Sequence, residues 1–264
     1  MRFFADDTTK PLLKERGCTR VLEIGASFGR NTEMILGLEG IQLTIIDPCI
    51  DLDLAAQFGE KVKVHKGLSL DVLPTITDTF DCIFVDGDHN WYTVFHELQL
   101  IEQHRLLNKD GIIFLHDVCW PYGRRDMYYQ PETVPAEFRK PYSRNGMEKG
   151  KATLVDSGGF NIGHWNALTE GGPKNGVLTA VEDFIGESTE KYHLIIDDRQ
   201  WGLGIVFRRT ARDSKKLVQR LRSQIFRRKH IEPKLQAWRQ LVLSAKMSKI
   251  GCVLRKIRNT IRGI

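Results

Sequence analysis

The sequence of 264 residues has no run of 18 apolar residues, so it predicts no membrane-spanning helix. Its first 17 residues also lack the apolar stretch and the small-residue cleavage site of a secretory signal peptide. Cysteine is scarce: there are five, with no CxxC pair, which argues against a disulfide framework and a structural zinc site. Internal repeats and low-complexity segments are absent as well. Together these absences favour a reduced, cytoplasmic setting.

The net charge of +6 is unevenly distributed along the chain. Residues 211–264 hold 16 Lys and Arg against two acids, whereas residues 1–210 hold 23 basic and 31 acidic residues. The basic character therefore belongs to the C-terminal segment, and the high isoelectric point does not make the whole protein a nucleic-acid binder. We expect two parts, a domain over 1–210 and a basic amphipathic helical tail over 211–264.

Short apolar runs alternate with helical patterns over the first 120 residues. Expected strands cover 19–24, 42–46, 61–65, 80–85 and 111–115, and expected helices cover 30–38 and 91–107. Continuous apolar strands separated by helices predict a parallel sheet covered on both faces. Residues 177–185 then predict a helix, and 193–196 with 203–208 predict a final antiparallel pair.

Residues 118–174 interrupt this alternation with Gly, Pro and aromatic residues and show no clean period. A segment of that length is usually functional or mobile. It directly follows the strand expected at 111–115, and its stretch from Trp120 to Tyr129 offers aromatic rings and arginines. We expect a lid over a small-molecule or glycan acceptor, the alternative being a loop whose aromatic residues pack on the domain.

A small-residue loop follows the first expected strand. Glu23 precedes Gly25-Ala26-Ser27-Phe28-Gly29, and Asp47 ends the second expected strand 18 residues after Gly29. Small residues allow close approach of a ligand, and an acid at the position of Asp47 accepts hydrogen bonds from ribose hydroxyls. The loop lacks G-x-G-x-x-G, which disfavours a nicotinamide dehydrogenase. A plain strand-to-helix turn is the alternative, but it leaves Asp47 unexplained.

The loop resembles motif I of the class I S-adenosylmethionine-dependent methyltransferases, E/D-x-G-x-G-x-G, with Ser27 in place of the middle glycine. The resemblance covers roughly 19–209. It implies an α/β fold, namely a Rossmann-like, doubly wound seven-stranded sheet with a terminal antiparallel strand. It also implies S-adenosylmethionine as a cofactor. The residues expected to bind it are Glu23, Gly25, Ser27, Gly29 and Asp47, with Ser69 near the adenine and Asp86 beside them.

Ionisable residues follow two further strands. Asp86-Gly87-Asp88-His89 ends the fourth, and His116-Asp117 ends the fifth. In a doubly wound sheet these ends meet in one crevice, where acids so close together need a counter-ion such as a divalent metal. From the residues alone, Asp86 as a helix cap and His89 as a supporting residue remain alternatives. Asp88 is a weaker candidate.

The pattern Asp-Gly-x-His with an acid after the next strand resembles the metal-dependent sugar O-methyltransferases of the macrocin and mycinamicin type. The resemblance implies that Asp86 and Asp117 bind magnesium or manganese and that His89 is the general base. Those relatives commonly carry two adjacent acids where this chain has His116-Asp117. We therefore include His116 as a candidate ligand, one that favours manganese or iron over magnesium.

Two other functions compete with a sugar O-methyltransferase. An RNA methyltransferase would use the basic tail, but the Asn/Asp-Pro-Pro-Tyr/Phe motif of amino-group methylation is absent after the fourth strand. A non-catalytic binding protein would keep the fold, but it would not need Asp47, Asp86 and His89 together.

Three apolar stripes recur at helical spacing in the tail, with Lys or Arg on the other face. They consist of Leu217, Leu221 and Ile225; of Leu235, Trp238, Leu241, Val242 and Ala245; and of Ile250, Val253, Leu254, Ile257 and Ile261. The alternatives are docking on the acidic part or on a second subunit of a homo-oligomer, peripheral contact with the inner face of an anionic membrane, and nucleic-acid binding. Only Phe226 and Trp238 offer stacking platforms, so nucleic acid is the least favoured partner.

Overall fold

The computed structural model describes residues 1–50, 57 and 59–241. The chain divides into two compact units, Met1–Ser214 and Lys215–Ile264. The first unit holds a seven-stranded sheet in the order β3-β2-β1-β4-β5-β10-β9. Its strands are β1 Arg20–Ile24, β2 Gln42–Ile46, β3 Val62–His65, β4 Phe80–Val85, β5 Leu107–His116, β9 Tyr192–Asp197 and β10 Leu203–Arg208.

Neighbouring strands from β3 to β5 run parallel, whereas β10 is antiparallel to both β5 and β9. The predicted Rossmann-like doubly wound sheet is therefore confirmed. The antiparallel strand is last in sequence but lies between β5 and β9, so β9 forms the edge. Because β10 starts beside the end of β5, with Leu203 opposite His116, the β9–β10 turn reaches the edge of the sheet where the parallel strands end.

The α-helices are α1 Lys10–Arg16, α2 Arg30–Leu36, α4 Ser69–Val72, α5 Trp91–Gln103, α6 Val177–Glu187 and α7 Ser214–Phe226. Short turns of other helix types are η1 Arg2–Phe4, η2 Ala5–Thr9, η3 Gly59–Lys61, η4 Leu73–Thr75, η5 Pro131–Thr133 and η6 Arg227–Ile231. The expected helix over 91–107 ends at Gln103, and Arg105 takes a left-handed φ of 53°. Strand β5 starts at Leu107, earlier than expected, because its polar residues 108–110 obscured the apolar run.

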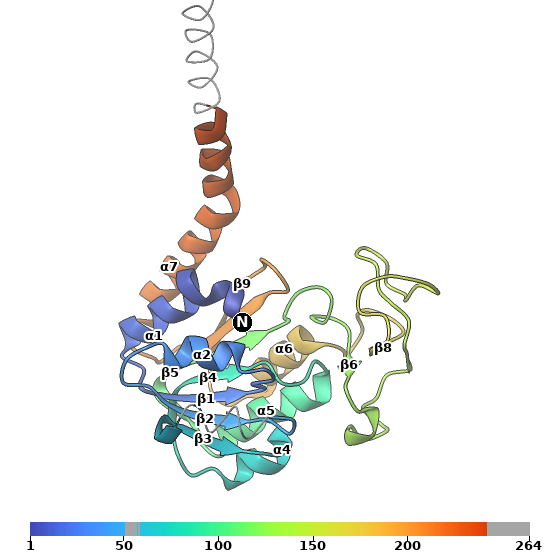
Figure 1. Ribbon diagram of the computed structural model, residues 1–264, viewed down its shortest axis with the longest axis horizontal. Coiled ribbons are helices and arrows are strands. Elements are labelled where there is room, and N and C mark those ends of the chain that lie inside the picture. The colour runs from blue at the N-terminus through green and yellow to red at the C-terminus, as the bar shows by residue number, and fades with distance from the viewer. Residues whose placement is uncertain (51–56, 58, 242–264) are drawn as a thin grey trace, which may run out of the picture. The chain divides into compact units, whose positions relative to one another are not determined.

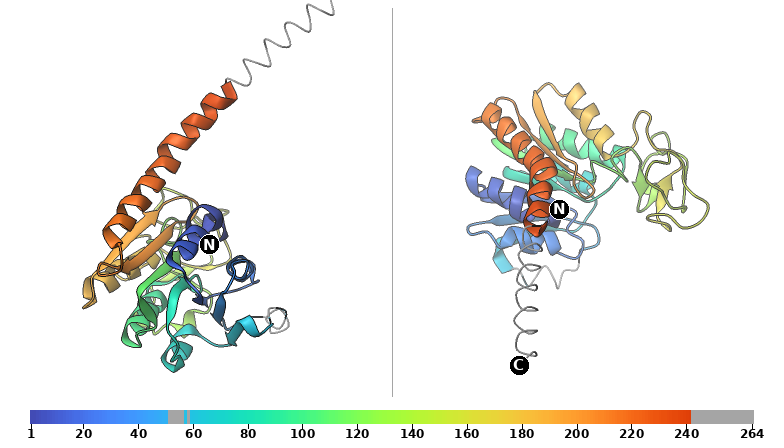
Figure 2. Two further views of the ribbon diagram at one scale, coloured as in Figure 1. Left: turned by 90° about the vertical axis from the view of Figure 1, so that its left-hand side faces the viewer. Right: turned by 90° about the horizontal axis from the view of Figure 1, so that it is seen from above.

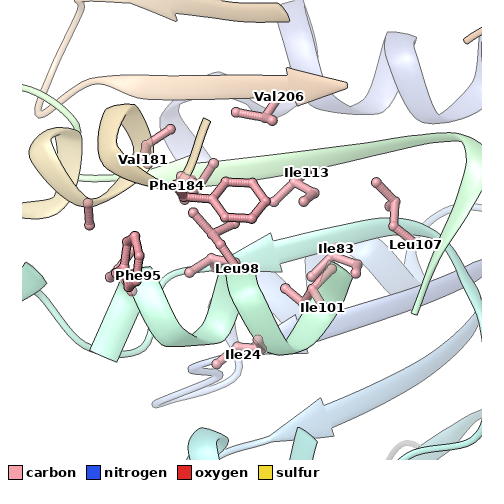
Figure 3. Packing of buried hydrophobic residues seen from close by; sticks show 14 of the residues in the cluster. Ile24, Ile83, Phe95, Leu98, Ile101, Leu107, Ile113, Val181, Phe184 and Val206 are labelled. Atoms are coloured by element: carbon pink, nitrogen blue, oxygen red, sulfur yellow. The ribbon is translucent and has the colours of Figure 1, made fainter. Parts of the chain in front are cut away.

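Helices α5 and α6 pack on one face of the sheet (Figure 1). Phe95, Leu98 and Ile101 of α5 lie against strand residues such as Ile83 and Ile113 (Figure 3). Side chains alternate between faces along a strand, so Glu23, between the core residues Leu22 and Ile24, points to the opposite face, where α2 begins. This two-sided cover explains why the parallel strands read as nearly continuous apolar runs.

Glu97 is a buried acid on α5. It is fully buried, and a side-chain hydrogen bond with Ser69 only partly offsets the cost of ionising its carboxylate there. Burial raises the pKa of Glu97 to about 8. In the unfolded chain Glu97 ionises near the ordinary pKa of glutamate. The free energy of unfolding therefore falls as the pH rises from that ordinary pKa to the raised pKa of the folded state.

We expect Glu97→Gln to remove that loss, because glutamine has the same shape and no charge. The gain in stability should be on the order of a few kcal/mol above pH 8 and should shrink toward pH 5, where native Glu97 is protonated. Denaturant unfolding of both proteins across this pH range measures it. The exposed Glu39→Gln is the control, and equal effects of the two substitutions would contradict the prediction.

The insertion after β5 has its own small antiparallel sheet, in the order β6-β8-β7. Its strands are β6 Met127–Tyr128, β7 Tyr142–Ser143 and β8 Trp165–Ala167. It stands beside the large sheet rather than on a helix-covered face (Figure 1 and the right-hand view of Figure 2).

Two buried charged residues anchor this insertion. The carboxylate of Asp126 accepts hydrogen bonds from the backbone N–H groups of Trp91 and Gly176, at the starts of α5 and α6. Arg125 donates to the carbonyl oxygens of Ala152 and Ala167 inside the insertion. The insertion is thus an ordered part of the first unit.

The second unit, taken by itself, begins with α7, continues through η6 and remains helical through residue 241. The predicted helical tail is observed over this part. The stripe from Ile250 to Ile261, with Val242 and Ala245, lies outside the described residues. No helix among the described residues is long and apolar enough to cross a membrane.

Candidate active site

The loop between β1 and α2 is shaped by three residues with positive φ, namely Gly25 (86°), Ser27 (50°) and Gly29 (73°). A Cβ atom on Gly25 would overlap Gly87 Cα and the carbonyl oxygen of Asp86. Only glycine therefore allows the ends of β1 and β4 to approach this closely. The predicted cofactor loop and the predicted catalytic segment are neighbours in space.

Glu23 and Asp47 support this loop from two sides. Glu23 is completely buried and accepts hydrogen bonds from Asn31 Nδ2 (2.8 Å) and Thr32 Oγ1 (2.6 Å) of α2. Burial raises the pKa of Glu23 to about 7, and these two hydrogen bonds oppose the rise. Asp47 accepts hydrogen bonds from the backbone N–H groups of Ser27 and Cys49, both at 2.7 Å.

Residues expected to bind S-adenosylmethionine lie around this loop. Asp47 directly follows β2, the strand next to the loop, and its hydrogen bond from Ser27 N ties the residue expected to hold the ribose to the loop. Ser69, expected near the adenine, is buried as the first residue of α4 and follows β3 at the same edge of the sheet. Of the predicted cofactor residues, Glu23 is the one whose carboxylate is turned into α2 rather than toward the crevice.

The predicted catalytic residues meet where β4 and β5 end. One ligand atom each of Asp86, His116 and Asp117 lies within 4.8 Å of the others, and these three residues form the acid–histidine cluster. His116 Nδ1 lies 3.2 Å from Asp86 Oδ1 and 3.0 Å from Asp117 Oδ2. His89 Nε2 lies 3.3 Å from Asp117 Oδ2. Asp117 thus links His89 to the acid–histidine cluster.

Electrostatics couple the members of this cluster. Burial opposes ionisation of Asp86, but the charge of His116 and a hydrogen bond from its ring hold the pKa of Asp86 at about 2. Burial likewise disfavours the charged ring of His116, but Asp86 and Asp117 raise its pKa to about 9. Asp117 also has a left-handed φ of 58°, a conformation that costs a non-glycine residue about 1–2 kcal/mol. The cluster is therefore held together by charge and by the surrounding fold.

Asp88 is not part of the cluster. Its carboxylate accepts hydrogen bonds from the His89 N–H (2.9 Å), Asn90 Nδ2 (2.6 Å) and Thr93 Oγ1 (2.8 Å). It therefore orders the turn that carries His89 into α5. The side chain of Asn90 accepts a hydrogen bond from Thr93 N and caps α5. Asn90, and not Asp86, is therefore the cap of this helix.

Aromatic rings surround the cluster. The rings of Tyr122 and Tyr129 lie 5.5 and 5.8 Å from the His89 ring, and Trp201 lies 5.9 Å from the His116 ring. Tyr122 is buried and hydrogen-bonded to Asn166, whereas Tyr129 and Trp201 are exposed. We call Tyr129 and Trp201 the aromatic rim.

Two aromatic residues beside the cluster were not predicted from the sequence. Trp201 belongs to the β9–β10 turn, and only the pairing of β10 beside β5 brings it to the site. Phe4, fully buried, lies 6.4 Å from the His116 ring. Its segment is held by Arg199, which binds Asp7 and Asp197. The sequence signal for Trp201 was a tryptophan in the short turn between the last two expected strands. The sequence carries no signal for Phe4.

Comparison with known proteins places a family match on this region. Residues 22–118, from β1 to just beyond β5, match the model of a methyltransferase domain. The O-methyltransferase hkm8 of Aspergillus hancockii is 26% identical over 119 residues, which are 39% of this chain and 45% of that protein. The chain thus matches less than half the length of this relative.

Solved structures with a related outline include a methyltransferase of Podospora anserina bound to S-adenosylhomocysteine. It is 16% identical, with a TM-score of 0.48 over 75% of each chain. The O-methyltransferase TomG of Streptomyces achromogenes is 18% identical, with a TM-score of 0.43 over 75% of this chain and 76% of that one. At these values the likeness does not extend to acceptor or mechanism. The family match thus falls on the part of the sheet that carries the glycine loop and the strand ends of the candidate site.

Proposed function

We propose that the protein is a divalent-metal-dependent O-methyltransferase acting on a hydroxyl of a sugar or glycan ring. The observation that carries this proposal is the convergence of His89 with the acid–histidine cluster, beside the glycine loop. A nucleophile-activating group and a cation-binding group thereby lie next to the place expected for the methyl donor.

The residues of this chain supply the proton transfer. The acceptor oxygen attacks the methyl carbon, the carbon–sulfur bond breaks, and its electron pair neutralises the sulfonium to a thioether. The hydroxyl proton moves to the imidazole ring of His89, whose Nε2 faces Asp117. Asp117, 3.3 Å away, orients this ring and stabilises the imidazolium that forms.

The donor set fits a divalent cation. Two carboxylates and one imidazole can be brought to one centre, since their ligand atoms already lie within 4.8 Å of one another. Asp86, His116 and Asp117 would hold the ion, and one imidazole among oxygen ligands suits manganese or iron better than magnesium. When bound, such an ion lowers the pKa of a coordinated hydroxyl.

The acceptor class is supported by the aromatic rim. Tyr129 is 58% exposed and Trp201 37% exposed, so both rings can receive a planar or pyranose face beside the cluster. A ring stacked there would present a peripheral hydroxyl toward His89. The remainder of the insertion, anchored through Asp126, would close over it as a lid.

The cofactor role of Asp47 leads to a binding prediction. Asp47→Ala should weaken S-adenosylmethionine binding by about ten- to hundredfold, because it removes charge-assisted hydrogen bonds to the ribose and support for the loop. Calorimetric titration measures this, with the exposed Glu39→Ala as the control. Unchanged affinity in Asp47→Ala would place the ribose elsewhere.

The transfer itself is tested with methyl-labelled S-adenosylmethionine and a panel of free sugars, glycosides and flat phenols, together with their amino analogues. Label should appear as a methyl ether on a hydroxyl acceptor, in the presence of manganese or magnesium. Label found only on the amines would overturn the proposed oxygen chemistry. Label found only on phenols would support methylation of oxygen but show that the acceptor is a phenol and not a sugar.

A further inference from the structure

The second unit exposes an apolar stripe on its described helix. Ile231, Leu235 and Trp238 are 42%, 47% and 63% exposed. Their spacing of four and three residues places them on one face of a helix. Large apolar side chains exposed together in this way mark an interaction surface.

Basic residues flank this stripe. Lys234 and Arg239 are exposed and lie on either side of it at helical spacing, whereas Gln236 and Gln240 lie on the opposite face. The whole unit, residues 215–264, contains 15 Lys and Arg and one acid, Glu232. The partner of the stripe must therefore offer apolar contact and negative charge along the same line.

We propose that residues 231–240 lie in the interface of an anionic lipid bilayer. Ile231, Leu235 and Trp238 enter the acyl boundary, and Lys234 and Arg239 extend along the surface to lipid phosphates. The tryptophan of the stripe, Trp238, suits the level of the headgroups. Residues 1–214, with 24 basic and 32 acidic residues, give no attraction to such a surface, so the tail supplies the binding.

Other occupants satisfy only one of the two requirements. A second copy of this unit would cover the apolar stripe but would bring two strongly basic segments together. A nucleic acid would neutralise the basic residues but would leave the stripe in water. An anionic bilayer satisfies both.

The test uses the full chain and vesicles of phosphatidylcholine alone or mixed in equal parts with phosphatidylglycerol. Two double variants carry two new serines each: Leu235→Ser with Trp238→Ser on the stripe, and Gln236→Ser with Gln240→Ser opposite. Circular dichroism checks that both remain helical. Co-sedimentation at an ionic strength of about 0.01 M and again at about 1 M separates charge from insertion.

The native chain and the glutamine variant should bind the mixed vesicles at low salt, and the stripe variant should bind at least about tenfold more weakly. Brominated lipid should quench the fluorescence of Trp238. The contribution of Trp238 is obtained by subtracting the quenching measured in Trp238→Phe, which keeps the other tryptophans. Equal binding by the native chain and the stripe variant, or no preference for anionic vesicles, would overturn the proposal. If the native chain forms a dimer that the stripe variant does not form, and if the native chain does not bind vesicles, the stripe would instead contact a second copy of the chain.

Discussion

Replacing His89 by alanine should slow methyl transfer by on the order of 10²–10⁴, the usual cost of losing a general base. In the proposed mechanism the imidazole accepts the hydroxyl proton, and Asp117 Oδ2, 3.3 Å from its Nε2, holds the ring in place. Binding of S-adenosylmethionine and of manganese should change little, because the proposed ligands Asp86, His116 and Asp117 are intact.

The pH–rate profile separates this role from a structural one. If His89 accepts the proton, the native profile should contain a limb on which the rate rises with pH, and that limb should be absent in His89→Ala. The exposed His104→Ala should keep both rate and limb. A His89→Ala enzyme that is slow but retains the limb would make His89 a positioning residue.

Asp86→Asn and Asp117→Asn should each abolish manganese retention and reduce the rate to near background. The amide cannot supply the negative charge that holds a divalent ion, and it leaves the buried His116 with one carboxylate partner instead of two. Metal content after dialysis, and the manganese signal in electron paramagnetic resonance, give readouts that do not depend on activity.

The control for these substitutions is Asp71→Asn, an exposed acid on α4. It should leave metal retention and rate unchanged. Affinity for S-adenosylmethionine should stay within severalfold in Asp117→Asn, since Asp47 and the loop are untouched. Native levels of bound manganese in both cluster variants would show that the ion lies elsewhere.

The ends of the parallel strands were predictable, and with them most of the site. Asp47 and Asp86 directly follow apolar strand residues, and His116-Asp117 follows the apolar run at the end of β5. Parallel strands bring such ends to one edge. Local sequence was sufficient here because the strand ends are fixed by a change from apolar to charged residues. Contact between His89 and Asp117 followed from the same geometry.

The insertion and the N-terminal cover were not predictable in the same way. Strands of two or three residues, such as β6 and β8, are too short to show a period. Asp126 has a defined role only because Trp91 and Gly176, distant in sequence, present their N–H groups to it. Phe4 reaches His116 through tertiary packing that no motif marks. Such contacts depend on the assembled fold.

Removal of divalent metal from the native enzyme tests the central claim most directly. After exhaustive chelation, with metal absent by elemental analysis, methyl transfer to a hydroxyl acceptor should fall by on the order of 10² or more, while S-adenosylmethionine still binds. Added manganese or magnesium should restore the rate in the native enzyme but not in Asp86→Asn. Full activity of the metal-free enzyme would contradict the account, and His89 would then have to activate the hydroxyl without an ion.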